Sequence, residues 1–350
     1  MIVGVPRETA PRERRVALTP PGVARLVAMG HEVVVQAGAG RAAGFADEHY
    51  RAAGARLAPT AAAVFAPADL VAWVKPPAFP LESVPHRPGL TLVGFQDPIH
   101  RAGQIAALRA AGVESIAFEW VSPGDAPEVD ALTAMSRIAG SVAYRAGRRL
   151  LPAHVRGRPV RSLVLGCGQA GRSAVAAAHA GADEPPVVVG LRPEQRDALI
   201  PVGPCEFRLA AAGIVDIIDA AKPDLVICAA TRRGEPAPVL VDAAALAALG
   251  PGAVVVDLAG KAGGNCVATV LDATVIRAGV TVTHRSNYPA RRPAAASHAY
   301  SAATVAMIRR LADHCGRPPF QRCSSAERNN SRQSPSSRSS NSASRRIAAW

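Results

Sequence analysis

The sequence predicts an α/β fold made of two doubly wound domains, each with a parallel sheet, that face each other across a cleft. Short apolar strands alternate with helical stretches along most of the chain, which is typical of parallel sheets covered by helices on both faces. With 350 residues, 49% hydrophobic and 19% charged, the chain can bury the cores of about two domains. A glycine-rich turn directly after Leu165 indicates where the second sheet begins.

The first half of the chain predicts one such domain, over residues 1–140. Thr19 as N-cap and Pro20 in the first turn indicate the start of the first helix. Regular spacing of the apolar segments argues for a parallel sheet. The expected strands are 2–5, 33–35, 69–74, 90–95 and 113–118, with helices at 20–29 and 104–111.

The second half predicts another doubly wound domain, over residues 145–290. Its expected strands are 163–165, 187–189, 225–228, 254–256 and 280–283. The helical stretch 295–313 should return to complete the first domain. The remaining segment, 316–350, is rich in arginine and serine and too poor in apolar residues to fold, so we expect a disordered tail.

The net charge of +13 does not by itself indicate a nucleic-acid partner. From Arg317 onward the chain has seven arginines and one glutamate, so nearly half of the charge lies in the tail. The six cysteines show neither paired spacing nor a metal-ligand pattern with histidine, which favours reduced thiols in a cytoplasmic protein and no metal site. No uncharged apolar run reaches 18 residues, so no membrane span is expected.

The glycine-rich turn is typical of a dinucleotide site. Gly166, Gly168 and Gly171 have the G-x-G-x-x-G spacing, and Gln169 and Ala170 begin a helical stretch. The first glycine permits a tight turn, the second lets the backbone approach a diphosphate, and the third allows close packing of helix and strand. The amides of the helix N-terminus then face the phosphates, with NAD(H) as the expected cofactor. The alternative is a purely structural glycine turn.

The end of the next strand lacks a usual feature of an NAD site. An Asp or Glu about 20 residues after the glycines normally binds the ribose hydroxyls. This chain has Gly190 there, and Arg192 follows two residues later. Arg192 either accepts a 2′-phosphate, which would allow NADP(H), or is a solvated loop residue.

Two basic residues of the first domain are candidates for substrate binding. Arg15 lies between the first strand and the first helix, and Lys75 follows the strand near residue 70. Both lie at carboxyl ends of strands, where doubly wound sheets bind ligands. An arginine fork fits a carboxylate and a lysine fits a carbonyl oxygen, so the pair suits a small 2-oxo or 2-amino acid. Two exposed basic side chains are the alternative.

Several motifs resemble the alanine dehydrogenase and nicotinamide nucleotide transhydrogenase family over residues 1–313. They are the segments 3–8 (VGVPRE), 15–20 (RVALTP), 31–40 (HEVVVQAGAG), 234–240 (GEPAPVL) and 255–266 (VVDLAGKAGGNC). The resemblance implies two Rossmann-like domains and an NAD(H)-dependent oxidoreductase.

Within the family, residues 130–140 and 263–266 are most similar to the NAD-binding domain of the proton-translocating transhydrogenase alpha subunit. This resemblance implies roles near the nicotinamide for Asp130 and at the cofactor for Asn265 and Cys266. Arg15 and Lys75 instead match the substrate-binding Arg and catalytic Lys of alanine dehydrogenases. The dehydrogenase histidine is replaced by Gln96 and its aspartate by Lys261.

Three hypotheses follow. The first is a transhydrogenase-alpha-like subunit that exchanges hydride between NAD(H) and NADP(H), with partner subunits that supply the NADP site and the proton channel. The resemblance then implies a homodimer, held peripherally at the inner face of the plasma membrane by those partners. The second is a soluble amino-acid dehydrogenase, and the third is an inactive nucleotide-binding homologue.

Overall fold

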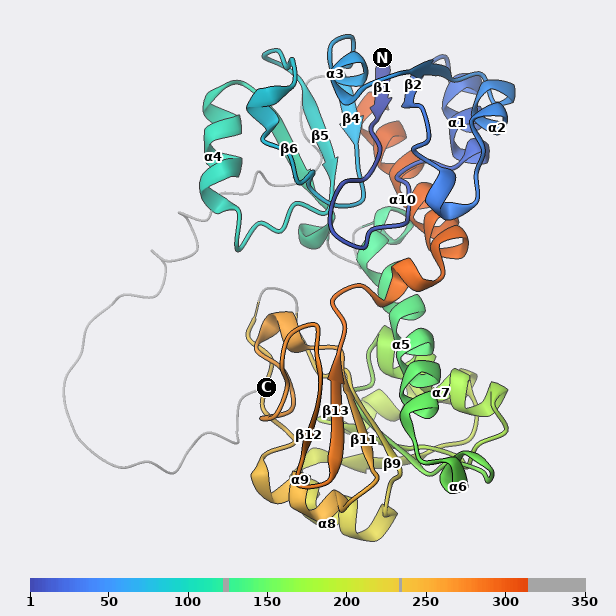
Figure 1. Ribbon diagram of the computed structural model, residues 1–350, viewed down its shortest axis with the longest axis vertical. Helices are drawn as coiled ribbons and strands as arrows, with labels where there is room; N and C mark the ends of the chain where they lie inside the picture. Colours follow the sequence, from blue (N-terminus) through green and yellow to red (C-terminus); the bar gives the residue numbers. More distant parts are fainter. Residues whose placement is uncertain (122–125, 233–234, 314–350) are drawn as a thin grey trace, which may run out of the picture.

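The computed structural model describes residues 1–121, 126–232 and 235–313, and these form two α/β domains arranged one above the other (Figure 1). Each domain has its own sheet, and helices cover both sides of it. The predicted class, two doubly wound parallel-sheet domains, is confirmed. The predicted tail lies outside the described residues.

The N-terminal domain contains a six-stranded sheet in the order β3-β2-β1-β4-β5-β6, and every neighbouring pair is parallel. This order places the first strand in the centre, where Val3 and Val5 are fully buried. The strands are β1 (Ile2–Val5), β2 (Glu32–Gln36), β3 (Arg56–Ala58), β4 (Leu70–Ala72), β5 (Thr91–Gly94) and β6 (Glu114–Ala117). The helices are α1 (Pro20–Ala28), α2 (Asp47–Ala52), α3 (Ala61–Phe65) and α4 (Ala102–Ala110).

The C-terminal domain contains a seven-stranded sheet in the order β12-β13-β11-β10-β7-β8-β9. Only the β12 and β13 pair is antiparallel among the described strands of this sheet. The strands are β7 (Ser162–Leu165), β8 (Val187–Gly190), β9 (Glu206–Leu209), β10 (Leu225–Cys228), β11 (Val254–Asp257), β12 (Thr274–Arg277) and β13 (Val280–His284). The helices are α6 (Ala153–Arg156), α7 (Gln169–Ala180), α8 (Ile214–Ala221) and α9 (Ala243–Leu249).

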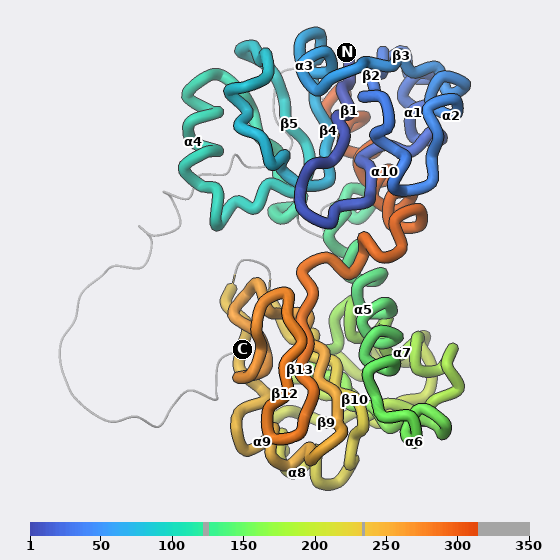
Figure 2. The backbone as a smooth tube through the Cα atoms, in the orientation of Figure 1, coloured from blue at the N-terminus to red at the C-terminus, as the bar shows by residue number. Residues whose placement is uncertain are grey.

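Two long helices join the domains (Figures 1 and 2). Helix α5 (Ala131–Leu150) leaves the N-terminal domain and packs along α7, so the expected boundary at 140–145 lies inside one continuous helix. Helix α10 (Pro293–Asp313) returns to the N-terminal domain, where Tyr300 and Met307 are buried in the same core as Val3.

The first helix begins where the sequence predicts, but Thr19 does not cap it with its side chain. Its backbone N–H and its hydroxyl both donate to the Ser301 hydroxyl on α10, over 3.1 and 3.3 Å. Thr19 is buried beneath the returning helix, so its polar groups bond to a residue from far along the chain instead of capping α1.

None of the helices in the described part of the chain is both long and apolar enough to cross a lipid bilayer.

Candidate functional site

The loop after β7 has the geometry of a phosphate-binding turn. Gly166 has a φ of +114°, and a Cβ there would lie 2.7 Å from the Ala229 carbonyl oxygen. A Cβ on Gly171 would lie 1.9 Å from the Gly166 oxygen, so glycine alone lets α7 pack against β7. A Cβ on Gly168 would meet no atom within 4 Å. The middle glycine thus faces open space, where a ligand can approach the backbone.

The start of α7 leaves its amides available for an anion. Gly168 is the N-cap residue, and no side-chain cap forms there within the described residues. The first-turn N–H groups, including those of Gln169 and Ala170, have no partner within the helix, and the helix dipole favours negative charge there. These residues fit the diphosphate of a dinucleotide.

Helix α5 supports this loop, a role that the sequence analysis missed. A Cβ on Gly140 would lie 1.9 Å from the Ala170 oxygen, so the helices approach closely at that point. Arg137 Nε donates to Gln169 Oε1 over 2.8 Å, and the Ser173 hydroxyl donates to the Arg137 carbonyl. Gln169 is therefore held against α5 rather than directed at the loop. A glycine inside a helical stretch, Gly140, was the available sequence signal for this close packing.

Asn265 and Cys266 serve the loop structure around the site. The Asn265 amide nitrogen donates to the carbonyls of Ala230 and Pro238 over 2.9 and 2.8 Å, and its oxygen accepts from the Ala230 amide. Asp257 accepts the backbone N–H groups of both Asn265 and Cys266. Cys266 is buried in an apolar cluster, which raises the pKa of its thiol. Both side chains are therefore occupied inside the protein, and they shape the segment rather than present a free polar group.

The residues at the end of β8 are closely packed. A Cβ on Gly190 would lie 2.6 Å from the Phe207 ring and 2.9 Å from both Cys167 Sγ and Gln195 Oε1. Arg192 is exposed just beyond the strand, at the start of the 3-10 helix Pro193–Val202.

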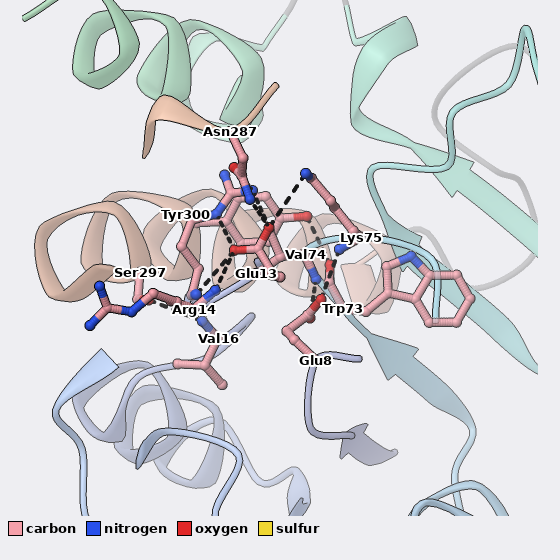
Figure 3. A network of polar contacts seen from close by, with 11 residues as sticks. Glu8, Glu13, Arg14, Val16, Trp73, Val74, Lys75, Asn287, Ser297 and Tyr300 are labelled. Carbon is pink, nitrogen blue, oxygen red and sulfur yellow. Dashed lines mark hydrogen bonds and ion pairs between the residues drawn. The ribbon is translucent and has the colours of Figure 1, made fainter. Parts of the chain in front are cut away.

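The N-terminal domain contributes a buried cluster of charges (Figure 3). Arg15 donates from Nε and Nη2 to the two oxygens of Glu13, each over 2.7 Å, and their side chains are 2% and 0% exposed. Asn287, from the segment after β13, accepts from Arg15 and donates to Glu13 over 3.1 and 2.9 Å. Lys75 Nζ lies 3.7 Å from Glu13, and its side chain is 22% exposed. The cluster joins the two domains and brings together Arg15 and Lys75.

A second buried carboxylate fixes the end of β4. Glu8 accepts from the backbone N–H groups of Val74 and Lys75 over 2.6 and 3.1 Å. The Tyr300 hydroxyl on α10 donates to the neighbouring Trp73 carbonyl over 2.8 Å. Lys75 is thus positioned by its own backbone contacts. The sequence pattern does not indicate Glu8 or Asn287, because their partners lie in distant segments, nor does it indicate that Glu13 pairs with Arg15.

Burial and neighbouring charges shift the pKa values of Glu8, Glu13 and Lys75 in different directions. Burial raises the pKa of Glu8 to about 8, and the nearby Glu13 charge adds to this rise. Although burial alone would raise it, the pKa of Glu13 is lowered to about 2 by the hydrogen bonds and charge of Arg15. Burial lowers the pKa of Lys75, and the positive charges of Arg15 and Lys261 lower it further.

The other predicted residues of this domain and Lys261 differ in burial and partners. Asp130 is buried and caps α5, accepting from the Thr133 amide over 3.0 Å. Gln96 is buried, and its backbone N–H donates to Glu119. Lys261 is exposed on the short 3-10 helix Gly260–Ala262, and its charge acts on Lys75. The structure thus brings Arg15 and Lys75 together around Glu13.

Two doubly wound domains with an uncapped glycine turn at the first strand of the second sheet define a dinucleotide-binding protein. The chain belongs to the alanine dehydrogenase/PNT family. The model of the family's N-terminal domain matches residues 4–139 and that of its C-terminal domain matches 139–321. The predicted family is confirmed, and with it an oxidoreductase whose family members bind NAD(H) and NADP(H).

Similar proteins divide between two named activities. The chain is 34% identical to the NAD(P) transhydrogenase subunit alpha of Cereibacter sphaeroides, over 86% of this chain and 64% of that protein. It is 36% identical to the alanine dehydrogenase of Mycobacterium tuberculosis (strain H37Rv), over 90% of this chain and 88% of that protein. A transhydrogenase structure from Sinorhizobium meliloti matches with a TM-score of 0.82 at 30% identity, covering 89% of this chain and 95% of that one. An L-alanine dehydrogenase structure matches with a TM-score of 0.80 at 28% identity, covering 90% of each.

Proposed function

We propose that this chain is a transhydrogenase-alpha-like subunit, which exchanges hydride between a nicotinamide nucleotide on its C-terminal domain and a second one on a partner subunit. The chain spans 64% of the length of the Cereibacter subunit. The proposal includes a homodimer, and partners that carry the second nucleotide site and the proton channel at the cytoplasmic face of the membrane.

The main support is the arrangement around Arg15. A 2-oxo acid substrate would need an arginine fork for its carboxylate. Here Glu13 occupies that fork through both Nε and Nη2, and the pair is buried. Direct exchange between two nucleotides needs no carboxylate partner, so the occupied fork favours it.

The residue at position 96 supports the same conclusion. Reductive amination needs a group that transfers a proton at the substrate carbon. The Gln96 amide cannot do this, and its Nε2 donates to the Leu92 carbonyl at 3.4 Å. Hydride exchange between two nicotinamide rings moves no such proton.

The chain's own residues would hold the nucleotide in defined ways. Gly168 leaves room for the diphosphate, which the amides at the start of α7 would bind. Gly140 and Arg137 on α5 keep that loop in position. When bound, the nicotinamide supplies the hydride donor or acceptor.

The test is hydride exchange itself. The purified chain is mixed with the complementary subunits of a transhydrogenase, and reduction of thio-NADP⁺ is followed with NADH or NADPH as donor. We expect turnover with at least one donor, and turnover should fall in Gly168→Ala, whose added methyl group meets no protein atom within 4 Å. Nucleotide binding without exchange under either donor would contradict the proposal and favour an inactive homologue.

A second candidate, an amino-acid dehydrogenase, is favoured by one observation. Lys75 is partly exposed beside Arg15, and burial lowers its pKa, as a catalytic lysine requires. This candidate predicts NADH or NADPH oxidation by pyruvate plus ammonium that is lost in Lys75→Ala. Absence of turnover with every 2-oxo acid tested would exclude it.

A further inference from the structure

We propose that a hollow beside the C-terminal end of α5 binds a small soluble anion that carries several phosphate charges. The hollow has a volume of about 540 Å³, which is typical of sites for small molecules. Four of its six lining residues are arginines and none is acidic, so its ligand should be an anion. The residues that line this arginine hollow are Arg145, Arg148, Arg149, Ala153, Arg156 and Gly157.

The arginine hollow lies away from the proposed nucleotide site. Its Arg148 bonds to Asp183, which precedes β8, and Asp183 also accepts the backbone N–H of Val160, which precedes β7. The hollow therefore lies near the amino ends of the parallel strands, whereas doubly wound sheets bind dinucleotides at the carboxyl ends. Figures 1 and 2 show α6 at the end of α5 that points away from the N-terminal domain.

One arginine of the hollow is already held in place. Arg148 Nε donates to both oxygens of Asp183 over 3.1 and 2.9 Å, and that carboxylate, which is 0% exposed, also accepts the Tyr144 hydroxyl over 2.9 Å. The two terminal nitrogens of Arg148 donate to no other residue in the described part of the chain, and its side chain is 30% exposed. A guanidinium that is anchored at Nε has little freedom to lose when its remaining donors bind an anion.

The other three arginines carry uncompensated charge. Arg145, Arg149 and Arg156 are exposed, and among the residues that the structure describes no carboxylate forms an ion pair with them. Arg145 is three residues before Arg148 and four before Arg149, and like charges at these helical spacings repel each other. An anion with several charges would remove this repulsion, and the oxygens of phosphate match the planar donor fork of arginine.

The arrangement of the arginines favours a compact ligand over a membrane surface. Three of them come from α5 and one from α6, and all four line the same hollow. Phosphates that lie close together, as in a nucleoside triphosphate or inorganic polyphosphate, can contact several of these guanidinium groups at once. The dipoles of the two helices also favour cations near their C-terminal ends, so the experiment includes an arginine at the end of another helix.

The test is calorimetric titration of the full chain with inorganic tripolyphosphate, with and without a saturating concentration of NADH. We expect one tripolyphosphate to bind per chain in both cases, at least about tenfold more tightly than orthophosphate, because several guanidinium groups need several phosphate charges. Arg149→Gln and Arg156→Gln remove one charge each and retain a long polar side chain. Each should weaken the binding of tripolyphosphate about tenfold, as loss of a charge-assisted hydrogen bond does.

Arg25→Gln is the matched control, since Arg25 is an exposed arginine in the last turn of α1, and it should leave the affinity unchanged. Equal affinity in all three variants would overturn the inference, because the anion would then bind elsewhere, for example at the arginines of segment 316–350. Binding that NADH abolishes would also overturn it, and so would binding to phosphatidylglycerol vesicles without binding of tripolyphosphate. If tripolyphosphate binds as expected and NADH does not bind, the proposed function fails and this inference stands.

Discussion

The loop after β7 depends on local backbone geometry, whereas the Glu13 cluster (Glu13, Arg15, Lys75 and Asn287) depends on side chains from distant segments. The loop places three glycines within six residues, and its geometry comes from backbone that no side chain obstructs. The cluster joins Glu13, Lys75 and Asn287, which come from both domains and lie up to 274 residues apart. The loop presents donors to a ligand, whereas the cluster satisfies its donors internally.

This difference shows how one fold can keep its nucleotide-binding loop while the charged residues that would act on a substrate change. A backbone site needs only local sequence, and so the chain can keep nucleotide binding while other positions vary. A buried charge cluster depends on every member, because a charge without its partner is costly in the interior. In this chain the cluster fills the arginine fork that a carboxylate substrate would use.

Loss of Glu13 should have the largest effect on stability. Glu13→Ala would leave Arg15 buried without its counter-charge, which costs about 3–5 kcal/mol in the free energy of unfolding. The measurement is urea unfolding of both proteins. Glu48→Ala is the control, because the Glu48 side chain in the Arg51 pair is 76% exposed and should cost less than about 1 kcal/mol. Equal, small losses of unfolding free energy in both variants would show that the Glu13–Arg15 pair is accessible to water.

The two buried glutamates should give opposite pH dependences. The folded-state pKa of Glu8, about 8, lies above its ordinary value of 4.5, so its contribution is full below pH 4.5 and is lost as the pH rises through 8. The folded-state pKa of Glu13, about 2, is lowered, so its contribution is present above pH 4.5 and is lost as the pH falls toward 2.

Unfolding free energies measured from pH 4.5 to 8 test the Glu8 half of this pattern. Wild type should lose stability across that range, and Glu8→Gln, which cannot ionise, should lose less. An unchanged slope in Glu8→Gln would mean that Glu8 is already ionised at neutral pH in the folded protein.

Two glycines of the loop should separate folding from binding. Gly171→Ala forces a Cβ to within 1.9 Å of the Gly166 oxygen and should destabilise the protein by about 1–3 kcal/mol. Gly168→Ala meets no neighbouring atom, so stability should change by less than about 0.5 kcal/mol. Its methyl group nevertheless stands where the diphosphate approaches, and nucleotide affinity, followed by the fluorescence of NADH and NADPH, should fall. Unchanged affinity in Gly168→Ala would remove the loop from the binding site.

The fold could be predicted from the sequence because its signals are local. Buried central strands such as β7 and β10 are continuous apolar runs, and the glycine spacing identifies the turn after β7. The edge strands β3, β9 and β12 were missed, since their residues are partly exposed and carry little periodic signal. Helix α5 was divided by a domain boundary because it belongs to both domains.

The candidate site was predictable only in part, for a related reason. The sequence indicates Arg15 and Lys75 through their places at strand ends, but it gives no sign that Glu13 fills the arginine fork. Asn265 was expected at the cofactor, yet its amide bonds to Ala230 and Pro238. In both cases the decisive partner lies in another segment, and only the folded arrangement shows which donors are already used.

The smallest expected effect distinguishes two threonines that precede helices in the N-terminal domain. Thr60 caps α3 by accepting from the Ala63 amide at 3.2 Å, whereas the Thr19 hydroxyl makes only a 3.3 Å bond to Ser301. Replacement by valine keeps the side-chain volume and removes the hydroxyl. Thr60→Val should therefore cost about 1 kcal/mol, as loss of an N-cap does, and Thr19→Val should cost less. Thermal and urea unfolding of both variants measure the difference. A larger loss of unfolding free energy in Thr19→Val than in Thr60→Val would contradict this expectation. It would mean that the Thr19 bond to α10 contributes more than an N-cap to holding that helix on the N-terminal domain.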